Sequence, residues 1–203
     1  MRRLLLVRHG QTDWNRQGRV QGHLDAPLND TGRAQAAAVA VALAGFAPTL
    51  VWSSDLSRAA ETASHIAGAA GVEVTLDQRL RERSWGEAEG LTGEEFQARH
   101  PGYSATDRPA ELDVLPGMEP IAVVRARMVA ALTDFLELVP AGGCGVAVSH
   151  GGACKAGVLG LMGWPDAGDA VLAGLDNCGW AELHREAGRP LRLISYNRTA
   201  PIS

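Results

Sequence analysis

The chain has 203 residues, of which 46% are hydrophobic and 21% are charged. This length and composition fit one packed domain, residues 1–203, and exclude collagen, coiled-coil and disordered chains. The formal net charge of −4 argues against a protein whose main task is to neutralise nucleic-acid phosphates. We therefore expect no nucleic-acid partner, and any anion site must be a local concentration of positive groups.

The sequence shows no sign of export or of membrane insertion. The apolar run Leu4–Val7 is too short for a signal peptide, and the long uncharged stretch Leu138–Cys154 contains a proline and five glycines. The three cysteines lack CxxC spacing, so they suggest neither a disulfide framework nor a zinc knuckle. We expect a cytoplasmic protein that does not contact a membrane.

Short apolar runs alternate with helical patterns along most of the chain. In chain order we expect strand Leu4–Val7, helix Gly32–Gly45, strand Thr49–Trp52, helix Ser57–Ala70, strand Val72–Leu76, helix Pro120–Leu138, strand Gly145–Val148, and a terminal hairpin of Gly179–Leu183 and Leu191–Tyr196. Thr31 is the expected N-cap of the first helix, and Gly71 ends the second. The alternation predicts an α/β fold, a three-layer α/β/α sandwich whose mostly parallel sheet has an antiparallel edge strand.

The segment from His100 to Glu119 breaks this regular pattern. Prolines and glycines interrupt any helical or strand period there. We interpret residues 100–119 as a lid or a surface insertion, and an ordinary long connection fits equally well.

Charged side chains follow several of the expected strands directly. Ligands of α/β sheets bind outside the carboxyl ends of the strands, so these positions are candidate site residues. They are Arg8 and His9 after the first strand, Arg58 at the start of the second helix, Glu82 after the third strand and His150 after the fourth. Two histidines, two arginines and one glutamate at one sheet edge make a poor core and a good cradle for an oxyanion.

The order of these residues resembles the histidine phosphatase superfamily, which includes phosphoglycerate mutases and many small-molecule phosphatases. Arg8-His9-Gly10 resembles the family's first motif. Later blocks also match it, namely Ser53–Ala59, Leu80–Glu82 and Ser149–Gly152. The resemblance covers nearly the whole chain outside the irregular segment and implies a phosphoglycerate mutase-like fold.

The resemblance also implies a mechanism and a set of roles. His9 would attack a phosphoryl group and form a phosphohistidine, with Arg8, Arg58 and a protonated His150 lowering its pKa and binding the phosphate. Glu82 would protonate the leaving alkoxide and then activate water. The implied substrate-binding residues are Asn15, Gln21, Gly22 and Gly151. No metal and no other cofactor is implied.

A zinc site is the alternative use of the same side chains. His9, Glu82 and His150 could supply three ligands, but no HxH, HxxxH or HExxH spacing supports this, and two nearby arginines would repel a dication. Among the other histidines, His23 is the one placed to line the pocket. Trp14 and Trp85 could form apolar walls or equally pack in the core.

The resemblance limits the reaction more than the substrate. Mutases of the family carry a longer insertion with paired arginines, whereas this chain offers only Arg99 and Arg108 there, which favours hydrolysis of a small-molecule phosphate ester. The motif spacing is most similar to glucosyl-3-phosphoglycerate phosphatases. Phosphoglycerate mutase and α-ribazole phosphatase activities stay open.

Two further questions stay open at this stage. A non-catalytic, phosphate-binding regulatory module is the alternative from another class, although all five residues of the expected mechanism are present. A homodimer is also open, through the stretch Leu159–Trp164 or through the terminal hairpin.

Overall fold

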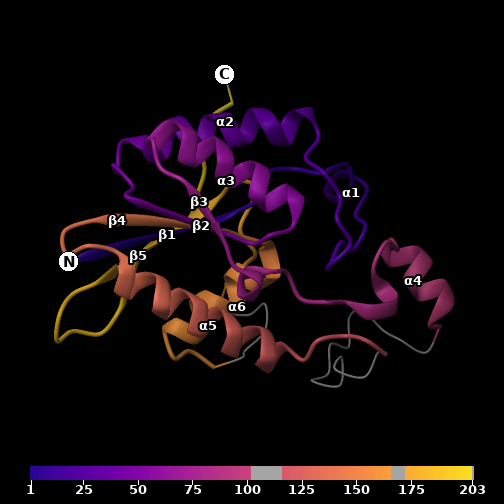
Figure 1. The fold of residues 1–203 in the computed structure, drawn as a ribbon. Coiled ribbons are helices and arrows are strands. Elements are labelled where there is room, and N and C mark those ends of the chain that lie inside the picture. The colour runs from indigo at the N-terminus through magenta and orange to yellow at the C-terminus, as the bar shows by residue number, and fades with distance from the viewer. Residues whose placement is uncertain (102–115, 166–171, 203) are drawn as a thin grey trace.

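The computed structural model describes residues 1–101, 116–165 and 172–202 and contains a six-stranded mixed sheet (Figure 1). The strand order is β3-β2-β4-β1-β5-β6. The strands are β1 (Arg2–Arg8), β2 (Leu50–Ser53), β3 (Val74–Leu76), β4 (Cys144–Ser149), β5 (Trp180–Arg185) and β6 (Arg192–Arg198). Strands β1 to β4 pair in parallel, while β5 and β6 form an antiparallel hairpin at the edge. The expected α/β/α fold with a mostly parallel sheet is confirmed, and its antiparallel edge contains two strands.

Helices cover both faces of the sheet (Figure 1). They are α1 (Asp13–Arg16), α2 (Asp30–Ala44), α3 (Ser57–Ala70), α4 (Gly93–Arg99), α5 (Ile121–Leu138) and α6 (Gly151–Leu161), with short 3-10 turns at Gln78–Leu80 and Gly86–Ala88. Alternate residues of β1 serve the two faces: Leu5 and Val7 pack with α2 and α3, whereas Leu4 and Leu6 pack with α5 and α6. All four are fully buried, as expected for the centre of such a sheet.

The expected strands, the three expected helices and the hairpin are present, but the N-cap of α2 was wrong and helices α1, α4 and α6 were not predicted. The N-cap of α2 is Asn29, whose side chain accepts the Gly32 N–H at 2.8 Å, and Thr31 lies inside the first turn. Helix α6 was missed because it begins with Gly151 and Gly152, which are poor helix formers. Leu159 of this helix is buried, whereas residues 160–164 are partly or fully exposed, so the open question of a homodimer through this stretch stays a prediction.

The irregular segment is described only at its two ends. Residues 102–115 lie outside the described residues, and the expected lid falls mostly on them. The part that follows is held against the loop after β3 by two backbone contacts. Met118 and Trp85 form an isolated antiparallel β-bridge, and the Glu119 N–H donates to the Ser84 carbonyl. Across the three described ranges, no helix has both the length and the apolar composition needed to cross a bilayer.

Candidate active site

The sheet register brings the two candidate histidines together. Strands β1 and β4 are parallel neighbours, and Arg8 pairs with Ser149 at their carboxyl ends. His9 and His150 are the next residues on each strand, and the His9 N–H donates to the Ser149 carbonyl at 3.0 Å. Their ring centroids lie 5.1 Å apart in an edge-to-face arrangement. The expectation that these distant loops meet at one sheet edge is confirmed.

His9 is held in one orientation and kept neutral. Its side chain is 3% exposed, and Nδ1 lies 2.6 Å from the Gly10 carbonyl, which can only accept, so Nδ1 carries the hydrogen. Nε2 is left with its lone pair. Burial lowers the pKa of His9 well below 6.5, and the charges of Arg58 and Arg8 lower it further. The imidazole is therefore uncharged at neutral pH, as a nucleophile must be.

Arg8 and Arg58 each have an Nε–H group without a hydrogen-bond partner among the described residues. Arg58 is fully buried and donates to the carbonyls of Gly22 and Leu24 at 2.8 and 3.0 Å, and Arg8 donates to the Leu175 carbonyl. Within the described part of the chain, the Nε atoms of both arginines are buried without a hydrogen-bond partner. A buried donor without a partner costs about 1–3 kcal/mol, which a bound oxyanion would recover.

These groups line one pocket of about 260 Å³. Eight of the residues expected from the sequence take part in its lining: Arg8, His9, Asn15, Gln21, Gly22, Arg58, Glu82 and Gly151. Trp85, one of the two tryptophans considered as pocket walls, also lines it, whereas Trp14 is not among the lining residues.

His150 is the exception among the expected residues, because it does not line the pocket. It is fully buried, and its Nε2 lies 2.9 Å from the Ser54 hydroxyl. The pKa of His150 lies well below 6.5, mainly because the ring is buried and secondly because the Arg58 charge is near. The expectation of a protonated His150 was therefore wrong, and the low pKa of His9 comes from burial and from the two arginines.

Glu82 connects the loop after β3, on which it lies, to the start of α6. Its carboxylate accepts the N–H groups of Gly152 and Ala153 at 2.9 Å and of Arg83 at 2.8 Å. The N-cap residue of α6, His150, makes no side-chain capping bond, so Glu82 caps the helix from a distant loop. Among the described residues, no group of three His, Cys, Asp or Glu side chains is placed to hold a metal ion.

The Asn15–Gly22 loop is fixed by a small hydrogen-bond network. Asn15 Oδ1 accepts from the Thr12 N–H, and the Thr12 hydroxyl accepts from the Asn15 N–H. The single proton of this hydroxyl has two acceptors in reach, Asn15 Oδ1 and Gln21 Oε1, each at 3.1 Å. Gly22 has a φ of 52°, and a Cβ there would lie 2.1 Å from a carboxylate oxygen of Glu89. Glycine adopts this left-handed conformation without strain, and any side chain here would have to displace the Glu89 carboxylate.

Two further residues contact the backbone carbonyl of Glu82: Arg127, which sequence reasoning did not assign, and His23, which it placed in the pocket lining. Arg127 of α5 donates to the Glu82 carbonyl at 2.9 Å, and it is anchored by both carboxylate oxygens of Glu119. His23 Nε2 lies 2.8 Å from the same carbonyl and is not among the pocket-lining residues, so its expected place was wrong. Arg127 has no sequence signal, because a helical arginine is usually a solvated charge.

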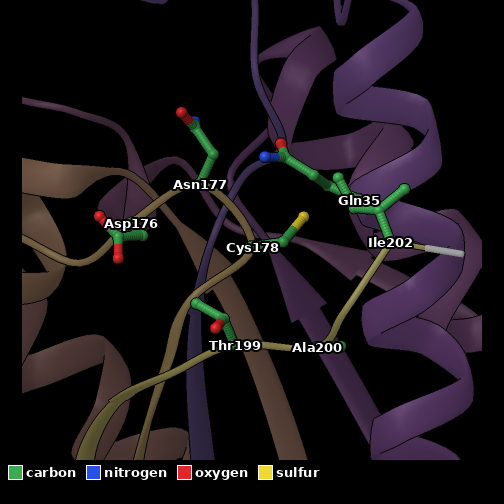
Figure 2. A pocket seen from close by; sticks show the side chains of 7 residues that line it. All are labelled: Gln35, Asp176, Asn177, Cys178, Thr199, Ala200 and Ile202. Carbon is green, nitrogen blue, oxygen red and sulfur yellow. The ribbon is translucent and has the colours of Figure 1, made fainter.

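A second hollow of about 280 Å³ lies next to the segment 176–178, which contacts the backbone of His9 (Figure 2). Asn177 lines it and donates to the His9 carbonyl, while the Cys178 N–H contacts the carbonyls of Arg8 and His9. Figure 2 shows the Cys178 side chain directed to the side where Gln35 and Ile202 lie. Burial raises the pKa of Cys178 to about 12, so its thiol stays protonated and is no nucleophile.

Comparisons with known proteins agree with this geometry. The sequence model of the histidine phosphatase superfamily (branch 1) matches residues 4–199. The chain is 37% identical to the glucosyl-3-phosphoglycerate phosphatase of Mycolicibacterium vanbaalenii, over 90% of this chain and 84% of that one. It is 39% identical to a probable phosphoglycerate mutase GpmB of Yersinia enterocolitica, over 88% and 82%.

A solved structure is similar over almost the full length of both chains. The mycobacterial glucosyl-3-phosphoglycerate phosphatase in complex with VO3 superposes with a TM-score of 0.87 at 35% identity. The similarity covers 98% of this chain and 100% of that one.

Proposed function

Since the chain belongs to branch 1 of the histidine phosphatase superfamily, we propose that it hydrolyses small phosphate monoesters through a phosphohistidine at His9, without a metal. One observation carries the proposal: a buried, neutral His9 presents Nε2 to a pocket lined by two arginines with unused donors. The two guanidinium groups around a phosphoryl group can supply stabilisation of the kind that Mg²⁺ gives in other phosphoryl transferases.

The first chemical step moves the phosphoryl group onto the enzyme. The lone pair of His9 Nε2 forms a bond to phosphorus while the ester P–O bond breaks and its electron pair stays on the leaving oxygen. A proton from Glu82 neutralises that oxygen and releases the alcohol. The guanidinium groups of Arg8 and Arg58 hold the equatorial phosphoryl oxygens, because they are charged at every relevant pH and present fixed donors.

The second step returns the enzyme to its starting state. Water attacks the phosphohistidine, Glu82 accepts a proton from it, and the P–N bond breaks with its electron pair returning to Nε2. Inorganic phosphate leaves, and Glu82 is protonated again for the next cycle. The three N–H groups that hold the Glu82 carboxylate fix its position through both steps.

We infer that the preferred substrate is glucosyl-3-phosphoglycerate. The support is the 37% identity to a phosphatase of that name and the presence of Trp85 in the pocket lining, where an aromatic ring can pack on a sugar. A relative named as a probable phosphoglycerate mutase has a similar sequence identity to this chain, 39%. Transfer back to the substrate would require the phosphohistidine to outlast exchange of the bound alcohol, and the absence of paired arginines in the expected insertion disfavours this.

The proposal is tested by phosphate release in excess EDTA from p-nitrophenyl phosphate, 3-phosphoglycerate, glucosyl-3-phosphoglycerate and α-ribazole phosphate. We expect release without added metal and the highest kcat/KM for glucosyl-3-phosphoglycerate. Loss of all activity in EDTA, restored by a divalent cation, would contradict the metal-free mechanism. A higher kcat/KM for another ester would replace the substrate, and faster interconversion of 2- and 3-phosphoglycerate than hydrolysis would make the protein a mutase.

A further inference from the structure

The pocket lining contains a third arginine that the proposed chemistry does not use. Arg19 lies in the Asn15–Gly22 loop and lines the same pocket as His9. Its side chain is 30% exposed, unlike the fully buried Arg58. Arg19 therefore sits on the outer wall of the pocket, where the part of a substrate beyond its phosphate would lie.

Arg19 already holds a carboxylate in the structure. Its two terminal nitrogens donate to the two carboxylate oxygens of Glu95 at 2.6 and 3.1 Å, which is the side-by-side geometry that guanidinium and carboxylate prefer. The Arg19 guanidinium also donates to the Gly90 carbonyl at 2.8 Å and to the Gln17 side chain. These two contacts fix the plane of the group independently of Glu95.

Glu95 is placed so that it can leave Arg19 at little cost. Its side chain is 44% exposed, and exposed ion pairs contribute little to stability. Glu95 also accepts the Thr92 N–H at 2.9 Å as part of the capping box of α4. When the contact with Arg19 breaks, the capping contact remains and α4 keeps its start.

We propose that Arg19 is a specificity residue that binds a substrate carboxylate, for which Glu95 holds the place in the empty pocket. The substrate class is then a phosphorylated hydroxy acid, whose phosphate binds at Arg8 and Arg58 and whose carboxylate replaces that of Glu95. This inference rests on the proposed phosphatase function. Beyond that function, it states that the pocket selects a substrate with a negatively charged carboxylate in addition to its phosphate.

The test compares two substrates that differ in one group. 3-Phosphoglycerate carries a carboxylate where glycerol 3-phosphate carries a hydroxymethyl group. In Arg19→Gln we expect KM for 3-phosphoglycerate to rise by about tenfold, with kcat nearly unchanged, and KM for glycerol 3-phosphate to stay constant. In Glu95→Gln the competing charge is gone, so KM for 3-phosphoglycerate should fall severalfold. Arg16→Gln is the matched control, because Arg16 pairs with Asp13 within the nearby helix α1 and is not among the residues that line this pocket.

Two outcomes would overturn the inference: equal KM changes for both substrates in Arg19→Gln, or a higher KM for 3-phosphoglycerate in Glu95→Gln. A loss of carboxylate binding can be distinguished from unfolding of the loop. Val20 keeps its backbone hydrogen bonds to Gly90 and Leu91 in Arg19→Gln, so inorganic phosphate should still raise the melting temperature of this variant. If the wild type hydrolyses neither ester, the proposed function fails for these substrates. The inference then depends on whether Arg19→Gln weakens binding of 3-phosphoglycerate, measured by thermal shift, but not binding of glycerol 3-phosphate.

Discussion

Two buried histidines make the stability of the protein depend on pH. Burial lowers the pKa of His9 and of His150 well below 6.5, and Arg58 lowers both further. Below pH 6.5 the unfolded chain therefore binds protons that the folded chain does not bind. Stability must then fall as the pH decreases, by up to about 1.4 kcal/mol per pH unit for each histidine. Urea denaturation between pH 7 and pH 5 measures this slope.

The matching variants separate the two contributions. His9→Gln and His150→Gln should each remove about half of the slope, because each deletes one group that titrates only in the unfolded chain. A slope that is the same in the wild type and in both variants would show that carboxylates, and not these histidines, set the acid sensitivity.

At the same scale, the role of Glu82 predicts a dependence on the leaving group. Glu82→Gln should lower kcat/KM for an alkyl phosphate by roughly 10²–10⁴, because the leaving alkoxide needs a proton. The loss for p-nitrophenyl phosphate should be much smaller, since p-nitrophenolate leaves without one. Equal losses for both esters would assign Glu82 to positioning alone.

Between elements, the loop after β1 approaches the start of α2 so closely that neither Gly10 nor Gly32 has room for a side chain. A Cβ on Gly32 would lie 2.0 Å from the Gln11 carbonyl oxygen, and one on Gly10 would lie 2.5 Å from the Gly32 carbonyl oxygen. Both obstacles are backbone atoms, which cannot move aside. This contact holds the loop that carries His9 against the helix, so a change here reaches the nucleophile.

Gly32→Ala should therefore destabilise the protein by more than about 3 kcal/mol, as an unrelieved backbone clash does. Gly68→Ala is the control, because a Cβ on Gly68 inside α3 meets nothing within 4 Å. It should stabilise the protein by about 0.5–1 kcal/mol through the better helix propensity of alanine. Chemical denaturation of the two variants distinguishes them, and a Gly32→Ala protein as stable as the wild type would contradict the close approach.

Most elements could be predicted from sequence patterns, and the exceptions have physical reasons. The central strands β1 and β4 are apolar runs buried on both faces, which periodicity detects. Helix α6 starts with two glycines that local propensity rejects. The structure needs small residues there, since a Cβ on Gly152 would lie 2.8 Å from Glu82. The tertiary contact overrides the local preference.

At the scale of the whole molecule, chain topology explains which site residues could be foreseen. Arg8 ends a strand, and His9, Arg58 and Glu82 follow strands, all at the carboxyl edge of the sheet, so their convergence follows from the fold. The support given by Arg127 could not be foreseen, because its partners are backbone carbonyls 45 to 48 residues away. Contacts to backbone leave no mark in the sequence of the partner.

The protonation state and the degree of burial of side chains could also not be predicted from the sequence. The neutral state of His150 follows from its complete burial beside Arg58, and a list of nearby charges cannot give the degree of burial. The same holds for the exposed pair of Arg19 and Glu95, which joins the pocket wall to α4 across 76 residues. The fold brings such pairs together only once the loops have packed.

The nucleophilic role of His9 is tested most directly by the rate of phosphate release from the His9→Ala variant at saturating substrate in excess EDTA. The arrangement of Nε2 and the two arginines predicts a loss of at least about 10⁴-fold, with inorganic phosphate still raising the melting temperature. A His9→Ala protein that retains activity within about a hundredfold of the wild type would contradict a phosphohistidine at this position.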